Sequence, residues 1–351
     1  MSYRVRVESV SWVEAMPLLR LARAWAVALR FEMWATAYVA LLVHVVSVAL
    51  IGFLIVGRET LPGADGHILN ALKHLLVPIR FFDDHVWAWV IWGVVCYLNK
   101  AFFGGVLCRL AAQRWGRVEK QGIGVAVGVV ARRFAWYTIT PVLPVALAGL
   151  LVIPLVLAGW MLRVPLLDWV GVVLAGPALL LALFAAVILA GLALAGPLFY
   201  PSLSVEVTDG YDTLSRVYAF GLGRPVSYLG AVLLLVVFGA VGGGLLMVLL
   251  GSGLWGAVWL LSYFSGLPPE YLISGESSTA ASEWLWYWVF GVLLLLPAAL
   301  CAYVYAGLTW VYLTLRQLYD GTPVSDVAPA SGPAAPAAHV SLAGEGGSGA
   351  G

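Results

Sequence analysis

Six long apolar stretches constrain this chain more than any other feature of its sequence. A helix needs about 20 apolar residues to cross the hydrocarbon of a bilayer. Six stretches are long enough, namely 34–56, 86–108, 137–160, 169–194, 226–250 and 284–313. Tryptophan and tyrosine stand at many of their ends, where amphipathic rings meet the headgroups. We therefore predict an all-α fold, a polytopic transmembrane helical bundle of about six spans within residues 34–313.

The composition points to the same surroundings. Hydrophobic residues make up 62% of the 351 positions and charged residues 11%, whereas about 25% of an ordinary soluble domain is charged. So few polar residues could not cover an apolar core in water, and hydrocarbon requires no such cover. The net charge of +1 argues against nucleic acid as a partner. The predicted partner is the lipid bilayer.

The distribution of lysine and arginine orients the predicted spans. Fourteen of these residues lie before span one, after span six or in the even-numbered loops, and four lie in the odd-numbered loops, with Lys100 set aside as intramembrane. The positive-inside rule then places both termini in the cytoplasm. Residues 1–33 become a cytoplasmic amphipathic segment and residues 314–351 a cytoplasmic tail. We expect disorder after about residue 322, because Ala, Pro, Gly and Ser offer little apolar surface to bury.

The cytoplasmic segments before spans one, three and five resemble one another. Each has an amphipathic pattern with arginine, around residues 18–29, 125–134 and 211–222. We predict three units, each an interfacial helix followed by a transmembrane hairpin. The alternative is that any cytoplasmic loop of a six-span protein contains arginines and an amphipathic turn.

The most informative polar pattern near a predicted membrane boundary lies between residues 206 and 224. Asp209 has the form of a helix N-cap with Asp212 in the first turn, and Asp212 and Arg216 are spaced for an ion pair on one helical face. With Glu206 and Arg224 they form a candidate cytoplasmic cluster for a protein partner, an ion or a headgroup. The alternative is a capped interfacial helix that only sets the angle at which the chain enters span five.

The same stretch carries a resemblance. Residues 206–216 have the pattern E-x-T-D-x-x-D-x-x-S-R, and an R-P-x-x-Y pattern begins at Arg224. Residues 104–112 and 312–321 agree with it. Together they resemble a family of uncharacterised bacterial six-span integral membrane proteins, although Gly210 and Thr213 are smaller than that pattern favours. The resemblance implies a shared architecture, a bacterial inner membrane location and a shared cytoplasmic surface, and it implies no reaction.

Two polar residues fall deep inside predicted spans. At 1.5 Å per residue, Lys100 lies about 12 Å from the cytoplasmic end of span two and His44 about 15 Å from that of span one. Ionisable residues at such depth are candidates for transport or proton relay, although lysine can also extend its amine to the headgroups. Prolines in spans three and four, which would kink those helices, add weak support for a transporter.

No pattern predicts a cofactor or a metal. Five residues suit zinc by type, namely His67, His74, Asp83, Asp84 and His85, but their spacing is not diagnostic. A solvated interfacial helix over residues 67–77 explains His67 and His74. We predict no cofactor, no metal site and no catalytic residue. The apolar segment 254–267 is too short to span the membrane and is expected to be re-entrant or interfacial.

These observations favour a non-enzymatic scaffold or accessory membrane component with a cytoplasmic interaction surface. The alternative is a transporter or permease that uses the kinked spans and the level of Lys100 and His44. An intramembrane enzyme is the least favoured class, because the sequence offers no clustered acids, paired catalytic histidines or nucleophile.

Overall fold

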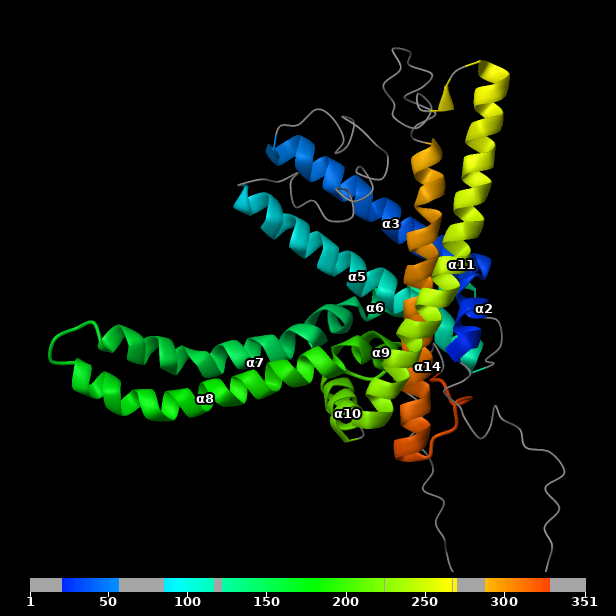
Figure 1. Ribbon diagram of the computed structural model, residues 1–351. Helices are drawn as coiled ribbons and strands as arrows, with labels where there is room; N and C mark the ends of the chain where they lie inside the picture. Colours follow the sequence, from blue (N-terminus) through cyan, green and yellow to red (C-terminus); the bar gives the residue numbers. More distant parts are fainter. Residues whose placement is uncertain are drawn as a thin grey trace, which may run out of the picture.

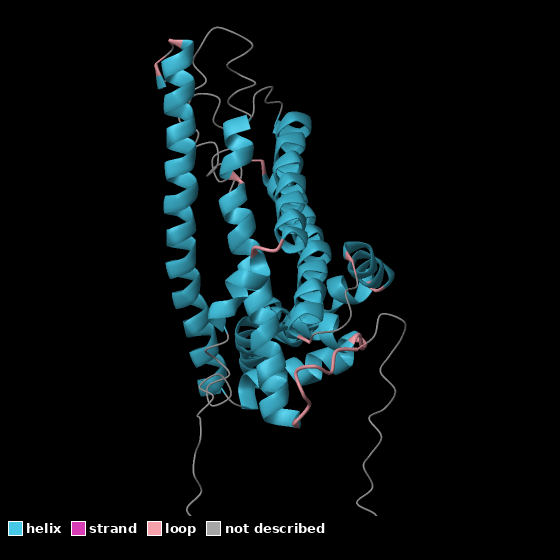
Figure 2. Ribbon diagram, turned by 90° about the vertical axis from the view of Figure 1, so that its right-hand side faces the viewer, coloured by secondary structure: helices cyan, strands magenta, loops and turns pink. Residues whose placement is uncertain are grey.

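The computed structural model describes residues 21–56, 85–116, 122–223, 225–266, 268–269 and 288–328. Within these ranges the chain forms helices and loops without a strand (Figure 2). The predicted all-α fold is therefore confirmed. Of the residues considered as zinc ligands, only His85 lies within the described ranges.

Among the described residues, six helices are long and apolar enough to cross a membrane: Phe31–Leu54, Val86–Trp115, Phe134–Met161, Asp168–Glu206, Pro225–Ser265 and Trp288–Asp320. Large apolar side chains remain exposed along them. Such surfaces suit hydrocarbon and not water, so the chain is a multi-pass membrane protein. In the labels of Figure 1, the helices are α2 Ala24–Ala28, α3 Phe31–Ile51, α5 Val86–Trp115, α6 Ile123–Arg132, α7 Phe134–Met161, α8 Asp168–Ala195, α9 Phe199–Glu206, α10 Gly210–Gly223, α11 Pro225–Ser265 and α14 Leu295–Asp320.

The long helices form three pairs that diverge from one common end (Figure 1). Helix α3 packs against α5, α7 against α8, and α11 against α14. The common end, which we call the base, consists of α2, α6, α9 and α10 with the adjoining ends of α5, α7 and α14. The largest buried cluster lies there. The three pairs are thus held mainly at the base and expose their apolar sides beyond it.

A short helix precedes each pair, as the sequence predicted. Helix α2 precedes α3, α6 precedes α7 and α10 precedes α11. The chain turns between α2 and α3 because Arg30 is extended, with ψ of 140°. The short helices are not confined to their own pairs: the Trp25 ring of α2 stacks on Tyr303 of α14, with centroids 4.4 Å apart, and its Nε1 donates to the Phe238 carbonyl of α11 at 2.9 Å.

The prediction for residues 254–267 is wrong over the described part of that segment. Helix α11 continues without a break from Pro225 to Ser265. The sequence Gly251-Ser252-Gly253 does not end it, and the Ser252 hydroxyl donates to the Leu249 carbonyl of the preceding turn. In apolar surroundings a continuous helix satisfies every backbone group, whereas a break would leave several without partners.

Proline and glycine act differently in the spans. Helix α7 contains Pro141, Pro144 and Pro154 without interruption, and it follows a curved path beside α8 (Figure 1). Glycines instead allow close packing: a Cβ atom added to Gly239 would lie 2.9 Å from the Tyr303 ring, and one added to Gly243 would lie 2.8 Å from Leu300. Both contacts are with α14, so these two glycines allow close helix packing.

Candidate functional site

The polar residues at the base lie around the junction of α9 and α10. Helix α9 ends at Glu206, and the next residue, Val207, caps it with a left-handed backbone, φ of 53°. Two residues later the Asp209 carboxylate accepts a hydrogen bond from the Asp212 backbone N–H at 2.9 Å. This is the predicted N-cap of α10, and it satisfies one of the free N–H groups at the start of that helix.

Glu206 connects this junction to α14. Its Oε1 accepts hydrogen bonds from the guanidinium of Arg316 at 2.7 Å and from the hydroxyl of Tyr312 at 3.1 Å. Its second oxygen lies 3.8 Å from the guanidinium of Arg216, which also contacts Asp212 at 3.0 Å. One carboxylate therefore joins α9 to both α10 and α14. Arg316 is 2% exposed, so this ion pair is shielded from water.

Other arginines of the base donate to backbone carbonyls. Arg109 of α5 is fully buried and donates to the carbonyls of Ser204 at 2.9 Å and Ala328 at 2.8 Å. Arg133 donates to the carbonyls of Val207 and Thr208. The carbonyls of Ser204, Val207 and Thr208 lie near the end of α9 and in the loop after it, where helical partners are missing. That of Ala328 lies in the tail after α14. We call Arg109, Arg133, Arg216, Arg316 and Glu206 the arginine network.

The first part of the tail belongs to this network. The backbone N–H of Ala328 donates to the Val205 carbonyl at 3.0 Å, and Arg316 donates to the carbonyls of Pro323, at 3.1 Å, and Asp326. Disorder after about residue 322 is therefore wrong for residues 323–328. Guanidinium groups compensate for the small apolar surface of this segment by binding its carbonyls. Residues 329–351 lie outside the described ranges.

Four residues of the predicted cytoplasmic cluster come together: Glu206, Asp209, Asp212 and Arg216. The fifth, Arg224, lies outside the described residues. The inner part of the cluster is structural, since Glu206 holds two helices. Its outer part remains accessible, because the side chains of Asp212 and Arg216 are 40% and 37% exposed. Burial by itself lowers the pKa of Arg216, but the Asp212 hydrogen bond and the Glu206 charge raise that pKa above its ordinary value. The guanidinium therefore stays charged.

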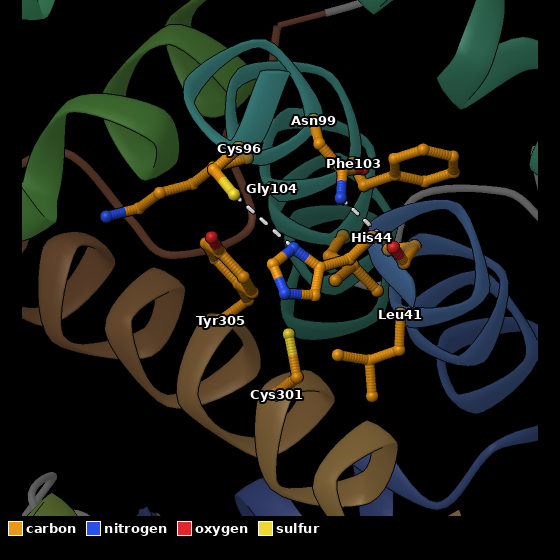
Figure 3. A pocket seen from close by; sticks show the side chains of 11 residues that line it. Leu41, His44, Cys96, Asn99, Phe103, Gly104, Cys301 and Tyr305 are labelled. Atoms are coloured by element: carbon orange, nitrogen blue, oxygen red, sulfur yellow. Dashed lines mark hydrogen bonds between the residues drawn. The ribbon is translucent and has the colours of Figure 1, made fainter. Parts of the chain in front are cut away.

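The second group of polar residues lies within the spans. His44 of α3 and Lys100 of α5 line the same cavity, of about 220 Å³, together with Cys96, Asn99 and Cys301 (Figure 3). We call this cavity the polar pocket. The similar depth predicted for His44 and Lys100 is thus reflected in a shared site between α3, α5 and α14.

The polar side chains of the pocket form hydrogen bonds with one another and with the backbone. Cys96 Sγ lies 3.4 Å from Nδ1 of His44, and the Asn99 amide donates to the Ala40 carbonyl at 3.0 Å. The Asn99 Oδ1 atom is buried and has no hydrogen-bond partner. No carboxylate lines the pocket, and the described residues contain no group of three His, Cys, Asp or Glu side chains that could hold a metal. Its lining thus offers an amine, an imidazole, an amide and two thiols as polar groups.

Sequence reasoning about the candidate cluster missed Arg109, Arg133 and Arg316. Each stands at the end of an apolar stretch, where arginine is ordinary under the positive-inside rule. A signal was present nonetheless, because Arg109 and Arg316 belong to the two further stretches that share the family-like pattern with residues 206–216. These three stretches therefore predicted that their residues contact one another, and they did not predict a bound ligand.

No protein-family model matches the chain, and neither a curated protein nor a solved structure is significantly similar to it.

Proposed function

We propose that this protein is a non-enzymatic scaffold or accessory component of a bacterial inner membrane, with its base and both termini in the cytoplasm. The arginines at the base support the orientation, because positive charge is retained on the cytoplasmic side. The proposed working surface is the outer side of α10. It bears Asp209, Asp212 and Arg216 and takes a protein partner.

One observation carries this proposal: the arginine network uses its inner charges to fix α10 and leaves the outer ones accessible. Tyr312 and Arg316 hold Glu206 from α14, and Glu206 in turn lies 3.8 Å from the Arg216 guanidinium of α10. Asp212 and Arg216 share a 3.0 Å ion pair on the outer side. A rigid helix with fixed charges loses little side-chain freedom when a partner binds.

Photocrosslinking tests this proposal. A photoreactive amino acid at Ser215, which is exposed on α10, should yield a discrete protein adduct in native membranes. Arg216→Ala should abolish that adduct. A photoreactive residue at Leu180, exposed on the apolar side of α8, serves as the control and should yield lipid adducts. If Ser215 yields no protein adduct, or an adduct unchanged by Arg216→Ala, the scaffold proposal loses its support.

The polar pocket favours a second candidate, a transporter or permease. Its lining combines Lys100 and His44 with two thiols, Cys96 and Cys301. In this case an aqueous path must reach the pocket, and a membrane-impermeant thiosulfonate should modify these cysteines in intact vesicles. Lys100→Leu should then abolish the flux. If only membrane-permeant maleimides react, and not the impermeant reagent, the transporter candidate is excluded.

A further inference from the structure

A second cavity, of about 260 Å³, lies at the base between α2, α5 and α14. Three arginines line it: Arg23 on the N-terminal side of α2, Arg30 between α2 and α3, and Arg114 near the end of α5. We call it the basic pocket. It is separate from the arginine network and from the polar pocket, and the proposed function above does not use it.

Among the described residues, the positive charges of the basic pocket exceed the negative ones. Arg114 forms an ion pair with Glu32. Arg23 and Arg30 are both exposed, and neither forms an ion pair with a carboxylate of the described residues. Counting these four groups, the pocket retains two uncompensated positive charges. The arginines of the network differ, because each of those has acceptors within the protein.

Two tryptophans give the basic pocket a rigid apolar wall. The rings of Trp115 and Trp310 have centroids 4.6 Å apart, and Nε1 of Trp115 donates to the Ala306 carbonyl at 3.0 Å. Trp310 is 2% exposed. The pocket therefore combines fixed aromatic surface with guanidinium groups, which favour bidentate contact with phosphate.

We propose that the basic pocket binds a phosphate group, carried by a phospholipid headgroup or by a soluble anion. The position favours the phospholipid, because α3 begins and α5 ends beside it. Leu29 and Phe31, on either side of Arg30, are 47% and 79% exposed. Apolar chains attached to the phosphate would lie against them. This argument rests on the proposed placement of the base at the membrane surface.

Native mass spectrometry of the full-length protein in neutral detergent tests the site. Dioleoyl phosphatidylglycerol should bind more tightly than dioleoyl phosphatidylcholine. A lipid-surface arginine contributes about a fivefold change in affinity, so the double variant Arg23→Gln/Arg30→Gln should weaken phosphatidylglycerol binding by about 25-fold. The matched control Arg132→Gln/Arg163→Gln removes two exposed arginines outside the pocket and should change little.

Inorganic phosphate forms the other arm of the experiment. If Arg23→Gln/Arg30→Gln loses only phosphate binding, the site is supported and its ligand is a soluble anion. Equal losses in both double variants would indicate general surface charge and overturn the proposal, as would a wild-type protein that binds neither anion. Crosslinking at Ser215 reports on the scaffold separately. Selective phosphatidylglycerol binding without that adduct would retain the pocket and reject the scaffold.

Discussion

Replacing Arg316 with methionine should destabilise the base more than any other single change in the network. The side chain donates to Glu206 at 2.7 Å and to two carbonyls of the tail. Removing one partner of a buried ion pair costs about 3–5 kcal/mol, because the other charge stays buried. Arg216 lies 3.8 Å from the second Glu206 oxygen and offsets part of this loss. We therefore expect the lower part of that range, about 3 kcal/mol.

A thiol-reactive dye can follow this loss. Cys108 is fully buried in the base, and replacing Cys96 and Cys301 with serine would leave it as the only cysteine of the chain. At about 2–4 °C per kcal/mol for a large domain, Arg316→Met should lower the temperature of dye labelling by about 6–12 °C.

The matched control is Arg163→Met, since Arg163 is exposed in the turn between α7 and α8. A loss no greater than that of the control would refute the assigned role of Arg316. A double-mutant cycle with Glu206→Gln isolates the pair. The two losses should be clearly less than additive, and strict additivity would show that the ion pair contributes nothing to stability.

Three further changes test other parts of the structure by the same labelling assay. Gly242→Ala should cost about 1–3 kcal/mol, because the added Cβ would lie 2.1 Å from an indole nitrogen of α2, whereas Gly244→Ala meets nothing within 4 Å and should be neutral or stabilising. Asp209→Ala should cost about 1 kcal/mol through the lost N-cap, and Asp209→Asn should retain most of it. Deleting residues 323–351 should destabilise the base, whereas deleting only 329–351 should not. Equal effects within any of these pairs would contradict the corresponding contact.

The spans could be predicted from the sequence because a bilayer imposes one requirement, a long apolar stretch, that needs no knowledge of neighbours. The cap at Asp209 and the ion pair between Asp212 and Arg216 could also be predicted, since both are local in sequence. The continuation of α11 beyond residue 250 could not be predicted in this way. The apolar run after residue 250 was counted as a separate segment too short to span, whereas an apolar environment favours continuation of the helix.

The long-range part of the base could not be derived from local patterns. Arg109 binds a carbonyl of Ala328, 219 residues away, and composition alone gives residues 323–328 no reason to be ordered. Their order depends on guanidinium groups contributed by α5 and α14. Likewise, depth arithmetic could place His44 and Lys100 at one level, but only the packing of α3 on α5 brings both to one cavity.

The attachment of residues 323–328 also bears on how the protein is made. A ribosome adds about 5–20 residues per second, so roughly 10–45 s separate the synthesis of Arg109 from that of Ala328. During this interval the nascent hairpins can insert one after another, but the guanidinium of Arg109 lacks its last acceptor. A chain interrupted before residue 328 would leave Arg109 with the Ser204 carbonyl but without its second acceptor. Closure of the base therefore requires synthesis of the chain through residue 328.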